Sequence, residues 1–373
     1  MKLEGGKINN LHLMFLVAGF TIGSTSIISP TPGADHDSWL AIFAGLAEGL
    51  VFVAVFLTLA QKFPGKTLIE VNDIIYGKYL GKIISIGYLW FFLHLGSLVL
   101  RNFGDFFFVY VFLDTPLIVV LGFTIALTAS AVRNGIEVIA RCSIILVPLI
   151  VLAYILDTLF VIPQMDMNRL LPIMDVPLTD FIKASHAAAT FPFGETVVFL
   201  MVIAFIKDDV KNTKKYFIFA LVFVSFLFSM AAARNAAVLG ATAQLDQYPS
   251  FVTISIIELG DIITRLEIIV VFTVFAMGFL KIAVCYYGTV LGYAQLLNMR
   301  SYLPLVVPIG IFMTVLSIIQ FETVTENIEW AGSIYPFYSL LFEFFLPLLS
   351  LVLASFKQPP EGKEGNINEA GGR

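Results

Sequence analysis

The sequence predicts an all-α integral membrane protein with ten transmembrane helices, arranged as a five-plus-five inverted repeat in which helices 1 and 6 are discontinuous. Three observations lead to this prediction. The chain has 373 residues, of which 58% are hydrophobic and only 13% are charged; soluble domains are roughly half apolar and about a quarter charged. Hydrophobic segments of spanning length recur along the chain. Glycine, proline and polar residues interrupt the first and the sixth of these segments.

The transmembrane domain is predicted to cover residues 11–356. A spanning helix needs about 20 mostly apolar residues. The segments that meet this requirement are Leu11–Pro30, Trp39–Ala60, Ile83–Leu113, Pro116–Val132, Val138–Val161, Phe181–Ile206, Tyr216–Leu239, Leu266–Leu296, Leu303–Gln320 and Tyr335–Phe356. Residues 1–10 form a short amino terminus with no cleavable signal peptide evident. Residues 357–373 form a polar tail that we expect to be disordered.

Charged residues in the connections predict the orientation, because Lys and Arg collect on the cytoplasmic side of a membrane protein. One side carries most of the basic residues, including Lys2, Lys7, Lys62, Lys66, Lys78, Lys82, Arg133, Arg141, Lys207, Lys211, Lys214, Lys215, Arg300 and Lys357. The other side carries acids, including Asp35, Asp37, Asp114, Asp166, Asp175, Asp246, Glu322, Glu326 and Glu329. The alternation holds across all ten segments and predicts that both termini are cytoplasmic.

The loop near Met165–Pro177 divides the spans into two halves, at about 11–161 and 181–356. Since each half has an odd number of spans, the second half enters the membrane from the opposite side. The halves therefore have inverted topology, and the first span matches the sixth. Interrupted helices at matching places in two halves are the best sequence indication of a solute site.

The sixth segment contains Phe191-Pro192-Phe193-Gly194-Glu195 at its midpoint. Proline removes a backbone donor and clashes with the preceding turn, and a glutamate in hydrocarbon is costly unless it faces a cavity or a partner. We interpret this stretch as a break in the helix. The alternative is a kinked helix whose glutamate pairs internally.

The first segment has a comparable weak point, which comprises Gly19, Phe20, Thr21, Ile22, Gly23, Ser24 and Thr25. At a broken helix, freed amides carry partial positive charge and freed carbonyls partial negative charge, which suits a zwitterion. We expect a second half helix to begin near Ser24-Thr25 and to bind a carboxylate. Carbonyls near Thr190 and Phe191, with Glu195, would bind an ammonium group or hydroxyls. The alternative for Gly19 and Gly23 is close helix packing.

The predicted ligand site is therefore built from both interrupted segments. Its candidate residues are Gly19, Thr21, Ile22, Gly23, Ser24, Thr25, Phe191, Phe193, Gly194 and Glu195.

Further charged residues lie inside spans. Arg101 and Asp105 in the third span are four residues apart and can form an ion pair on one helix face; we interpret the pair either as a gate or as structural. Lys281 in the eighth span requires an acidic partner, for which Glu195, Glu48 and Glu343 are candidates. It is either a proton-coupling group or a permanently paired structural residue.

Two connections are predicted to be helical. Leu68–Tyr79 has apolar residues at helical spacing and lies at the inner surface. Phe251–Arg265 lies at the outer face and is either a lid over the site or a helix lying on the membrane interface.

Catalytic and cofactor motifs are absent from the sequence. Cys142 and Cys285 have no metal-ligand or disulfide spacing, and no nucleophile–histidine arrangement or phosphate-binding loop is evident. We therefore expect no enzymatic activity, no cofactor and no metal site. The chain also has no basic patch for nucleic acid.

The chain resembles the amino acid–polyamine–organocation transporter superfamily, which has the leucine-transporter-like fold. More specifically, it resembles the B subunits of GerA-type spore germinant receptors. The resemblance extends from about Lys7 to Phe356. It rests on the short amino terminus with its lysines, Gly23, the Phe191–Glu195 motif, the basic turn Lys207–Lys215 and Arg265-Leu266-Glu267.

This resemblance implies a nutrient-sensing subunit of the bacterial spore inner membrane. Such subunits bind amino acids, sugars or nucleosides and assemble with an A-type subunit and a C-type lipoprotein. The alternative function is a proton-coupled secondary amino acid transporter, and a third is a membrane scaffold without a working site. Sensor and transporter share a fold, so the sequence pattern alone does not separate them.

Overall fold

The computed structural model describes residues 3–25, 27–208, 210–240, 248–255 and 267–356, without the side chains of Ser24, Val210, Lys211 and Glu267. The described part of the chain is helical apart from its connections and one isolated bridge between Ile8 and Ile206. The first half contains α1 (Asn10–Thr25), η1 (Asp35–Asp37), α2 (Ser38–Lys62), α3 (Leu68–Tyr110), α4 (Leu117–Arg133), α5 (Ile136–Val161), η2 (Ile162–Gln164) and η3 (Met167–Leu170). The second half contains α6 (Leu178–Ala188), η4 (Ala189–Phe193), η5 (Gly194–Met201), η6 (Ile203–Phe205), α7 (Val210–Leu239), α8 (Pro249–Ser255), α9 (Glu267–Leu296), α10 (Leu303–Ile319), α11 (Val324–Ser333), α12 (Tyr335–Leu340), η9 (Leu341–Phe345) and α13 (Leu346–Phe356).

Each of the ten predicted spans coincides with one of these helices or with a run of them. Among the described residues, six segments are long and apolar enough to cross a membrane by themselves. Helices α10 and α11, which meet at a bend of 97°, make a seventh if the pair counts as one span. The apolar helices α1 and α4 are shorter. The sixth span is assembled from α6 and three short helices.

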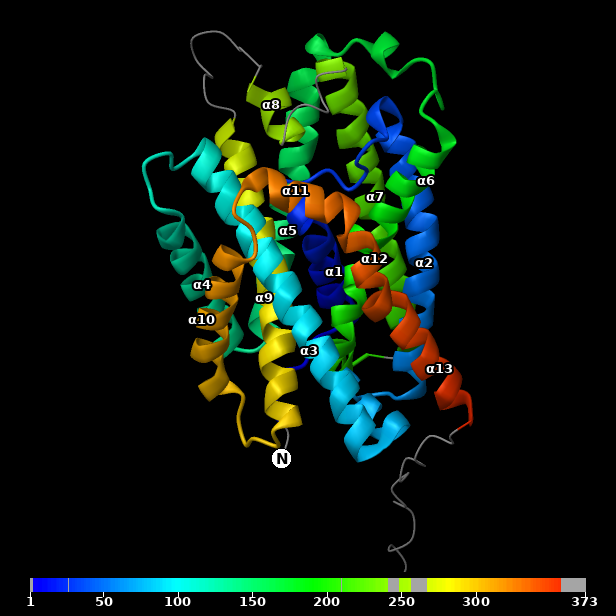
Figure 1. Cartoon of the computed structure of the whole chain (residues 1–373), viewed down its shortest axis with the longest axis vertical. Helices are drawn as coiled ribbons and strands as arrows, with labels where there is room; N and C mark the ends of the chain where they lie inside the picture. The colour runs from blue at the N-terminus through cyan, green and yellow to red at the C-terminus, as the bar shows by residue number, and fades with distance from the viewer. Residues whose placement is uncertain (1–2, 26, 209, 241–247, 256–266, 357–373) are drawn as a thin grey trace, which may run out of the picture.

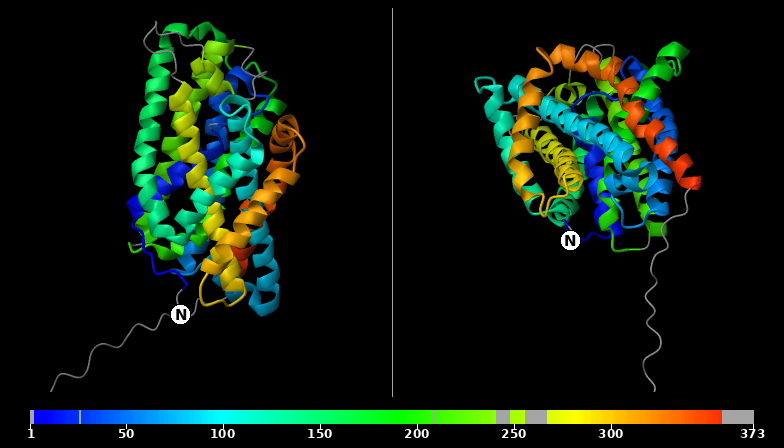
Figure 2. Two further views of the ribbon diagram at one scale, coloured as in Figure 1. Left: turned by 90° about the vertical axis from the view of Figure 1, so that its left-hand side faces the viewer. Right: turned by 60° about the horizontal axis from the view of Figure 1, so that its bottom comes forward.

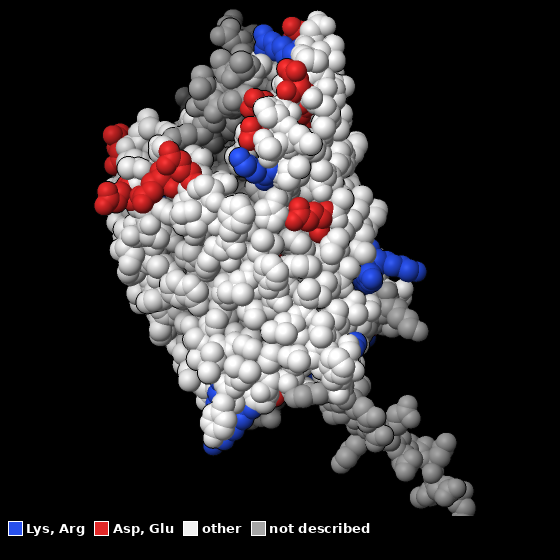
Figure 3. Space-filling model, turned by 45° about the vertical axis from the view of Figure 1, so that its right-hand side comes forward, with Lys and Arg blue, Asp and Glu red and all other residues white. Residues whose placement is uncertain are grey.

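The helices run roughly parallel to the long axis of the molecule, with α1 in the interior (Figures 1 and 2). The beginning of the chain and the end of α13 lie at the same end of the molecule, which we call the inner end (Figure 1). The opposite, outer end carries α8 and α11. Figure 3 shows a broad area of uncharged side chains on this face, with the acidic residues mostly above it and basic residues at its right edge and below it. An uncharged surface of this kind fits the hydrocarbon core of a bilayer.

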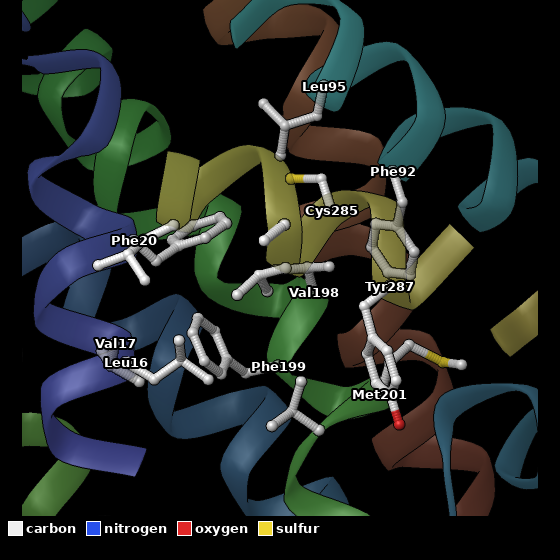
Figure 4. Packing of buried hydrophobic residues seen from close by; sticks show 14 of the residues in the cluster. Leu16, Val17, Phe20, Phe92, Leu95, Val198, Phe199, Met201, Cys285 and Tyr287 are labelled. Atoms are coloured by element: carbon white, nitrogen blue, oxygen red, sulfur yellow. The ribbon is translucent and has the colours of Figure 1, made fainter. Parts of the chain in front are cut away.

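The core forms around α1, which packs against α5, α7 and α9. Below the break in the sixth span, η5 inserts between α1, α3 and α9, and its residues Gly194–Met201 are all buried. Figure 4 shows Val198 and Phe199 of η5 among side chains of α1 and α9. The rings of Phe20 and Phe199 meet edge to face at 5.3 Å. The inner side of the break is therefore closely packed.

Small residues on α2 let the sixth span approach closely. A Cβ atom at Gly45 would lie 2.5 Å from Cβ of Ala188, and one at Gly49 would lie 2.7 Å from Cβ of Phe193. Such contacts between backbones stabilise helix pairs in membranes. They hold both sides of the break against α2.

The predicted amphipathic helix Leu68–Tyr79 is the first part of α3, where Thr67 and Glu70 form a capping box. Gly77 interrupts α3 with a φ of +79°, a conformation that favours glycine. The outer helix predicted over Phe251–Arg265 is described only as α8, because residues 256–266 lie outside the described part of the chain. The predicted disordered tail also lies outside it. Helix α11 was not predicted.

Residues before α1 are hydrogen-bonded to the end of the sixth span and to the residues directly after it. The backbone amide of Ile8 donates to the carbonyl of Phe205 at 3.1 Å, and the amide of Lys207 donates to the carbonyl of Ile8 at 2.9 Å. The carboxylate of Glu4, itself 9% exposed, accepts hydrogen bonds from the hydroxyls of Tyr287 at 3.1 Å and Tyr302 at 3.4 Å. This segment closes the inner end of the molecule.

Candidate functional site

The sixth span breaks within the predicted motif. Phe191 leaves the helical region, with φ −116° and ψ +107°, inside the π-helix η4. Pro192 follows directly and cannot donate to the preceding turn, and the chain continues from Gly194 as a 3₁₀-helix. Irregular backbone at membrane depth is tolerated where protein surrounds it, and here residues 189, 190 and 192–195 are all buried.

The first span ends differently from the prediction. Helix α1 continues through Thr25, and residues Ile27–Gly33 are not helical. Ser24 and Thr25 therefore lie in the last turn of α1, and the expectation that they begin a second half helix is wrong. Pro30 and Pro32 explain why the helix does not resume there. The hydroxyl of Thr25 donates to the carbonyl of Ile22 at 2.9 Å.

Lys281 forms a buried ion pair with Glu195. Its ammonium group donates to Oε2 of Glu195, and both residues are at most 1% exposed. The phenyl rings of Phe20 and Phe191 flank the ammonium group, with centroids 5.2 and 4.9 Å from Nζ. Of the other two candidate partners, Glu48 contacts Nδ1 of His186 at 2.7 Å.

Gly23 lets the Lys281 side chain pass between α1 and α9. A Cβ atom at position 23 would lie 2.7 Å from both Cβ and Cδ of Lys281. An ion pair withdrawn from water needs good geometry and further hydrogen bonds to offset its desolvation. Oε1 of Glu195 accepts one of these from the hydroxyl of Tyr335 at 2.8 Å. An internal lysine thus occupies the position that we predicted for a ligand ammonium group.

A cavity of about 380 Å³ lies on the outer side of the two interruptions. The end of α1, the segment Ile27–Gly33 and Phe191 border it, together with α7, α8 and α11. Its polar lining residues include Thr25, Ser29, Thr31, Asp35, Ser38, Asn235 and Ser250. The volume lies within the range of about 300–1,000 Å³ typical of small-molecule sites.

A second, much smaller cavity of about 20 Å³ adjoins Glu195 and Tyr335. Asn102, Asn327 and Trp330 also line it. It has room for about one water molecule.

The other predicted site residues divide into two groups. Thr25 and Phe191 line the large cavity. Gly19 packs against Leu280, and the hydroxyl of Thr21 donates to the carbonyl of Val17 inside α1. The remaining predicted residues, Ile22, Phe193 and Gly194, are buried away from the lining of the large cavity, and the side chain of Ser24 lies outside the description.

Arg101 and Asp105 form the predicted ion pair, with Nε and Oδ1 2.8 Å apart. The Nη1 group of Arg101 also donates to the carbonyl of Phe321 at 2.7 Å, in the bend between α10 and α11. Oδ2 of Asp105 accepts from Asn327 of α11 at 3.3 Å. The pair thus positions α11, which borders the cavity.

Tyr335 and Glu343 complete the buried cluster around Lys281. The sequence named Glu343 only as one candidate partner of Lys281, and it gave Tyr335 no role. The Tyr335 hydroxyl lies 3.4 Å from Oε1 of Glu343. Glu343 could have been singled out from the sequence, because an acidic side chain inside a membrane span is energetically costly and usually functional. Asn327 was missed as well, because α11 has no hydrophobic pattern of spanning length.

Comparison with known proteins agrees with this architecture. A family model described as "Spore germination protein" matches residues 7–324. The chain belongs to the spore germination protein family. Spore germination protein KB of Bacillus subtilis is 27% identical over 361 residues, which is 95% of this chain and 96% of that protein. Spore germination protein B2 of the same organism is 21% identical over 312 residues, covering 81% and 83% of the two chains.

Solved structures confirm the fold of this spore germination protein. Mhp1, a nucleobase-cation-symport-1 family transporter, aligns with a TM-score of 0.67 at 13% identity, covering 94% of this chain and 90% of the transporter. MhsT, in complex with L-phenylalanine, also aligns with a TM-score of 0.67, at 11% identity and 95% and 99% coverage. The predicted fold class, an all-α bundle with the leucine-transporter-like fold, is confirmed. The chain is an integral membrane protein of transporter-like fold, and its relatives are named as spore germination proteins.

Proposed function

We propose that this chain is the nutrient-sensing subunit of a spore germination receptor. A small solute binds in the cavity of about 380 Å³ and biases a conformational equilibrium that partner subunits detect. The position of this cavity against both interrupted helices is the observation that carries the proposal. Such interruptions leave backbone groups free to contact a solute.

The chemistry of the cavity favours a neutral solute or one that carries an amine. Hydroxyls, the Asn235 amide and the Asp35 carboxylate supply hydrogen-bonding groups, and Phe228 and Tyr154 supply apolar surface. No lysine or arginine is among the described residues of the lining. The carboxylate of a solute would therefore have only uncharged donors, which are the hydroxyls, the Asn235 amide and backbone amides.

Phe191 links the cavity to the buried ion pair. One part of this residue borders the cavity, and its ring lies over the ammonium group of Lys281. A solute that displaces Phe191 changes the surroundings of Lys281 and Glu195, and hence the packing of the sixth span. The solute shifts the equilibrium only by the difference in its affinity for the two conformations.

Family membership supports assembly with further subunits in a membrane complex. We propose an A-type subunit and a C-type lipoprotein as these partners, and the spore inner membrane as the location, with both termini cytoplasmic. The described chain start and the end of α13 lie at the same end of the molecule, as this orientation requires (Figure 1).

Filling the cavity tests the proposal. Ala232 lines the cavity, whereas Ala126 of α4 is exposed on the outside of the helix bundle. Spores carrying Ala232→Leu are expected to need a higher nutrient concentration for germination than spores carrying the control Ala126→Leu. A panel of amino acids, sugars and nucleosides would serve as nutrients, with subunit abundance measured in parallel. Equal responses at equal abundance would exclude the cavity as the sensing site, leaving the scaffold alternative.

The proton-coupled transporter remains the second candidate, because the chain has a transporter-like fold and a buried Lys281–Glu195 pair next to the cavity. Uptake of the same radiolabelled panel into proteoliposomes, with and without a pH gradient, separates the two functions. Gradient-dependent accumulation by the purified chain would establish transport.

A further inference from the structure

Two carboxylates and one ammonium group are buried together where the last span meets the broken sixth span. Glu195 is 1% exposed, and Lys281 and Glu343 are completely buried. Tyr335, 3% exposed, lies between the two carboxylates. If both acids were ionised, the cluster would carry one uncompensated negative charge.

The hydrogen bonds distinguish the two acids. Glu195 receives the Lys281 ammonium on one oxygen and the Tyr335 hydroxyl on the other, at 2.8 Å, which is the environment of an ionised carboxylate. Glu343 has a longer contact of 3.4 Å with the same hydroxyl and also faces the Ser339 hydroxyl. Its Oε2 atom has no hydrogen-bond partner within the described chain.

The backbone is shaped to hold Glu343 in this position. Glu343 lies at the centre of the π-helix η9, and η4 in the opposing span is also a π-helix. Such segments occur frequently at functional sites. A Cβ atom at Gly194 would overlap Oε2 of Glu343. The glycine before Glu195 therefore admits a second carboxyl group to the same site.

We propose that Glu343 is a proton-binding site and is held here as a neutral carboxylic acid. Two acids that share a buried site cannot both ionise against a single cation. Lys281 compensates Glu195, and the titratable groups that face Glu343 in the described chain are Glu195, Lys281, Tyr335 and Tyr338. A bound proton neutralises the Glu343 carboxylate and, unlike a second cation, needs no additional cavity.

Separation of the sixth span from the last span is therefore coupled to release of the proton from Glu343. When the last span and the sixth span separate and water enters, Glu343 releases its proton to water and becomes a carboxylate. The new negative charge repels Glu195 and opposes closure of the two spans. This inference does not depend on which solute the cavity binds or on whether the protein senses or transports.

Infrared spectroscopy of the purified full-length chain tests the proposal, because a protonated carboxyl group has a carbonyl stretch that a carboxylate lacks. Wild-type protein at neutral pH is expected to show one such buried, deuterium-sensitive band, and Glu343→Gln is expected to remove it. Glu195→Gln should also remove it, since Glu343 then becomes the ionised partner of Lys281. Lys281→Met should add a second protonated carboxyl. Glu329→Gln, at an exposed position on α11, is the matched control and should change nothing.

A wild-type spectrum without the band, or a band that survives Glu343→Gln, would overturn the proposal. A band that appears only after sodium and potassium are removed would assign a metal cation to the site instead, which also overturns it. If Lys281→Met or Glu195→Gln fails to fold, the comparison of wild type with Glu343→Gln decides, because glutamine matches the shape of a neutral glutamic acid. No nutrient is added, so the result is independent of the sensing experiment.

Discussion

Replacing Gly23 by alanine tests whether α1 and α9 must approach closely around the Lys281 side chain. The added Cβ would lie 2.7 Å from Cβ and Cδ of Lys281, roughly 1 Å closer than the ordinary carbon–carbon separation of about 3.5–4.0 Å. Cβ of Lys281 is fixed to the α9 backbone, so a change of rotamer cannot relieve the contact at that atom. Either the helices separate or the ammonium group leaves Glu195.

The magnitude follows from these two outcomes. Overpacking costs about 1–3 kcal/mol, and the better helix propensity of alanine offsets up to about 1 kcal/mol of this. Loss of the ammonium group would leave Glu195 as an unpaired buried charge, which costs about 3–5 kcal/mol. Relative to a glycine-to-alanine change at an uncrowded helix position, which gains the same helix propensity, we therefore expect Gly23→Ala to destabilise the protein by between about 1 and 5 kcal/mol.

Thermal unfolding can be followed by thiol labelling of Cys285, which is fully buried, in a Cys142→Ser background. The matched control is Gly122→Ala in α4, where an added Cβ would meet nothing within 4 Å. Its apparent unfolding temperature should stay the same or rise, because alanine favours the helix. A Gly23→Ala protein as stable as the Gly122→Ala control would refute the close approach of α1 to Lys281.

Three further predictions concern the two ends of the molecule. Arg101→Gln should destabilise the protein by about 3–5 kcal/mol, because it leaves Asp105 buried without its cation. In the same thermal assay, the double variant Arg101→Gln with Asp105→Asn should recover part of this loss. Glu4→Gln should lower the free energy of unfolding by about 1–3 kcal/mol, because it leaves buried donors unsatisfied. Amide hydrogen exchange at residues 6–8 should then accelerate. The control Glu137→Gln, at the more exposed ion pair with Arg141, should have little effect. Burial and the nearby Glu4 carboxylate raise the pKa of Tyr302 from 10.0 to about 12. The folded protein therefore retains this proton longer than the unfolded chain, and stability should fall between pH 10 and about 12 with a slope that Tyr302→Phe reduces.

Local chemistry determined much of the fold. The number and order of the spans follow from apolar runs of spanning length, because backbone groups inside hydrocarbon must be satisfied within a helix. The break at Phe191–Glu195 was predictable as well, since Pro192 removes a donor from its own turn. The first span was predicted to break within Gly19–Thr25 and to resume as a helix near Ser24. Helix α1 instead continues through Thr25, and two prolines and a left-handed Gly33 follow it.

Other features depend on residues far apart in the chain. Lys281 had three candidate acids, and only the packing of α9 against η5 selects Glu195, which lies 86 residues away. The role of Gly23 became clear only with the path of the lysine side chain between two helices.

The cavity, the bend before α11 and the approach of Glu343 to Gly194 likewise have no local signature. The sequence alone therefore determined which segments cross the membrane and where the sixth one breaks. Tertiary packing decided which charged side chains pair and where the cavity lies. Residues so far apart in the chain are brought together by complementary shape and charge, which the local sequence around each residue does not encode.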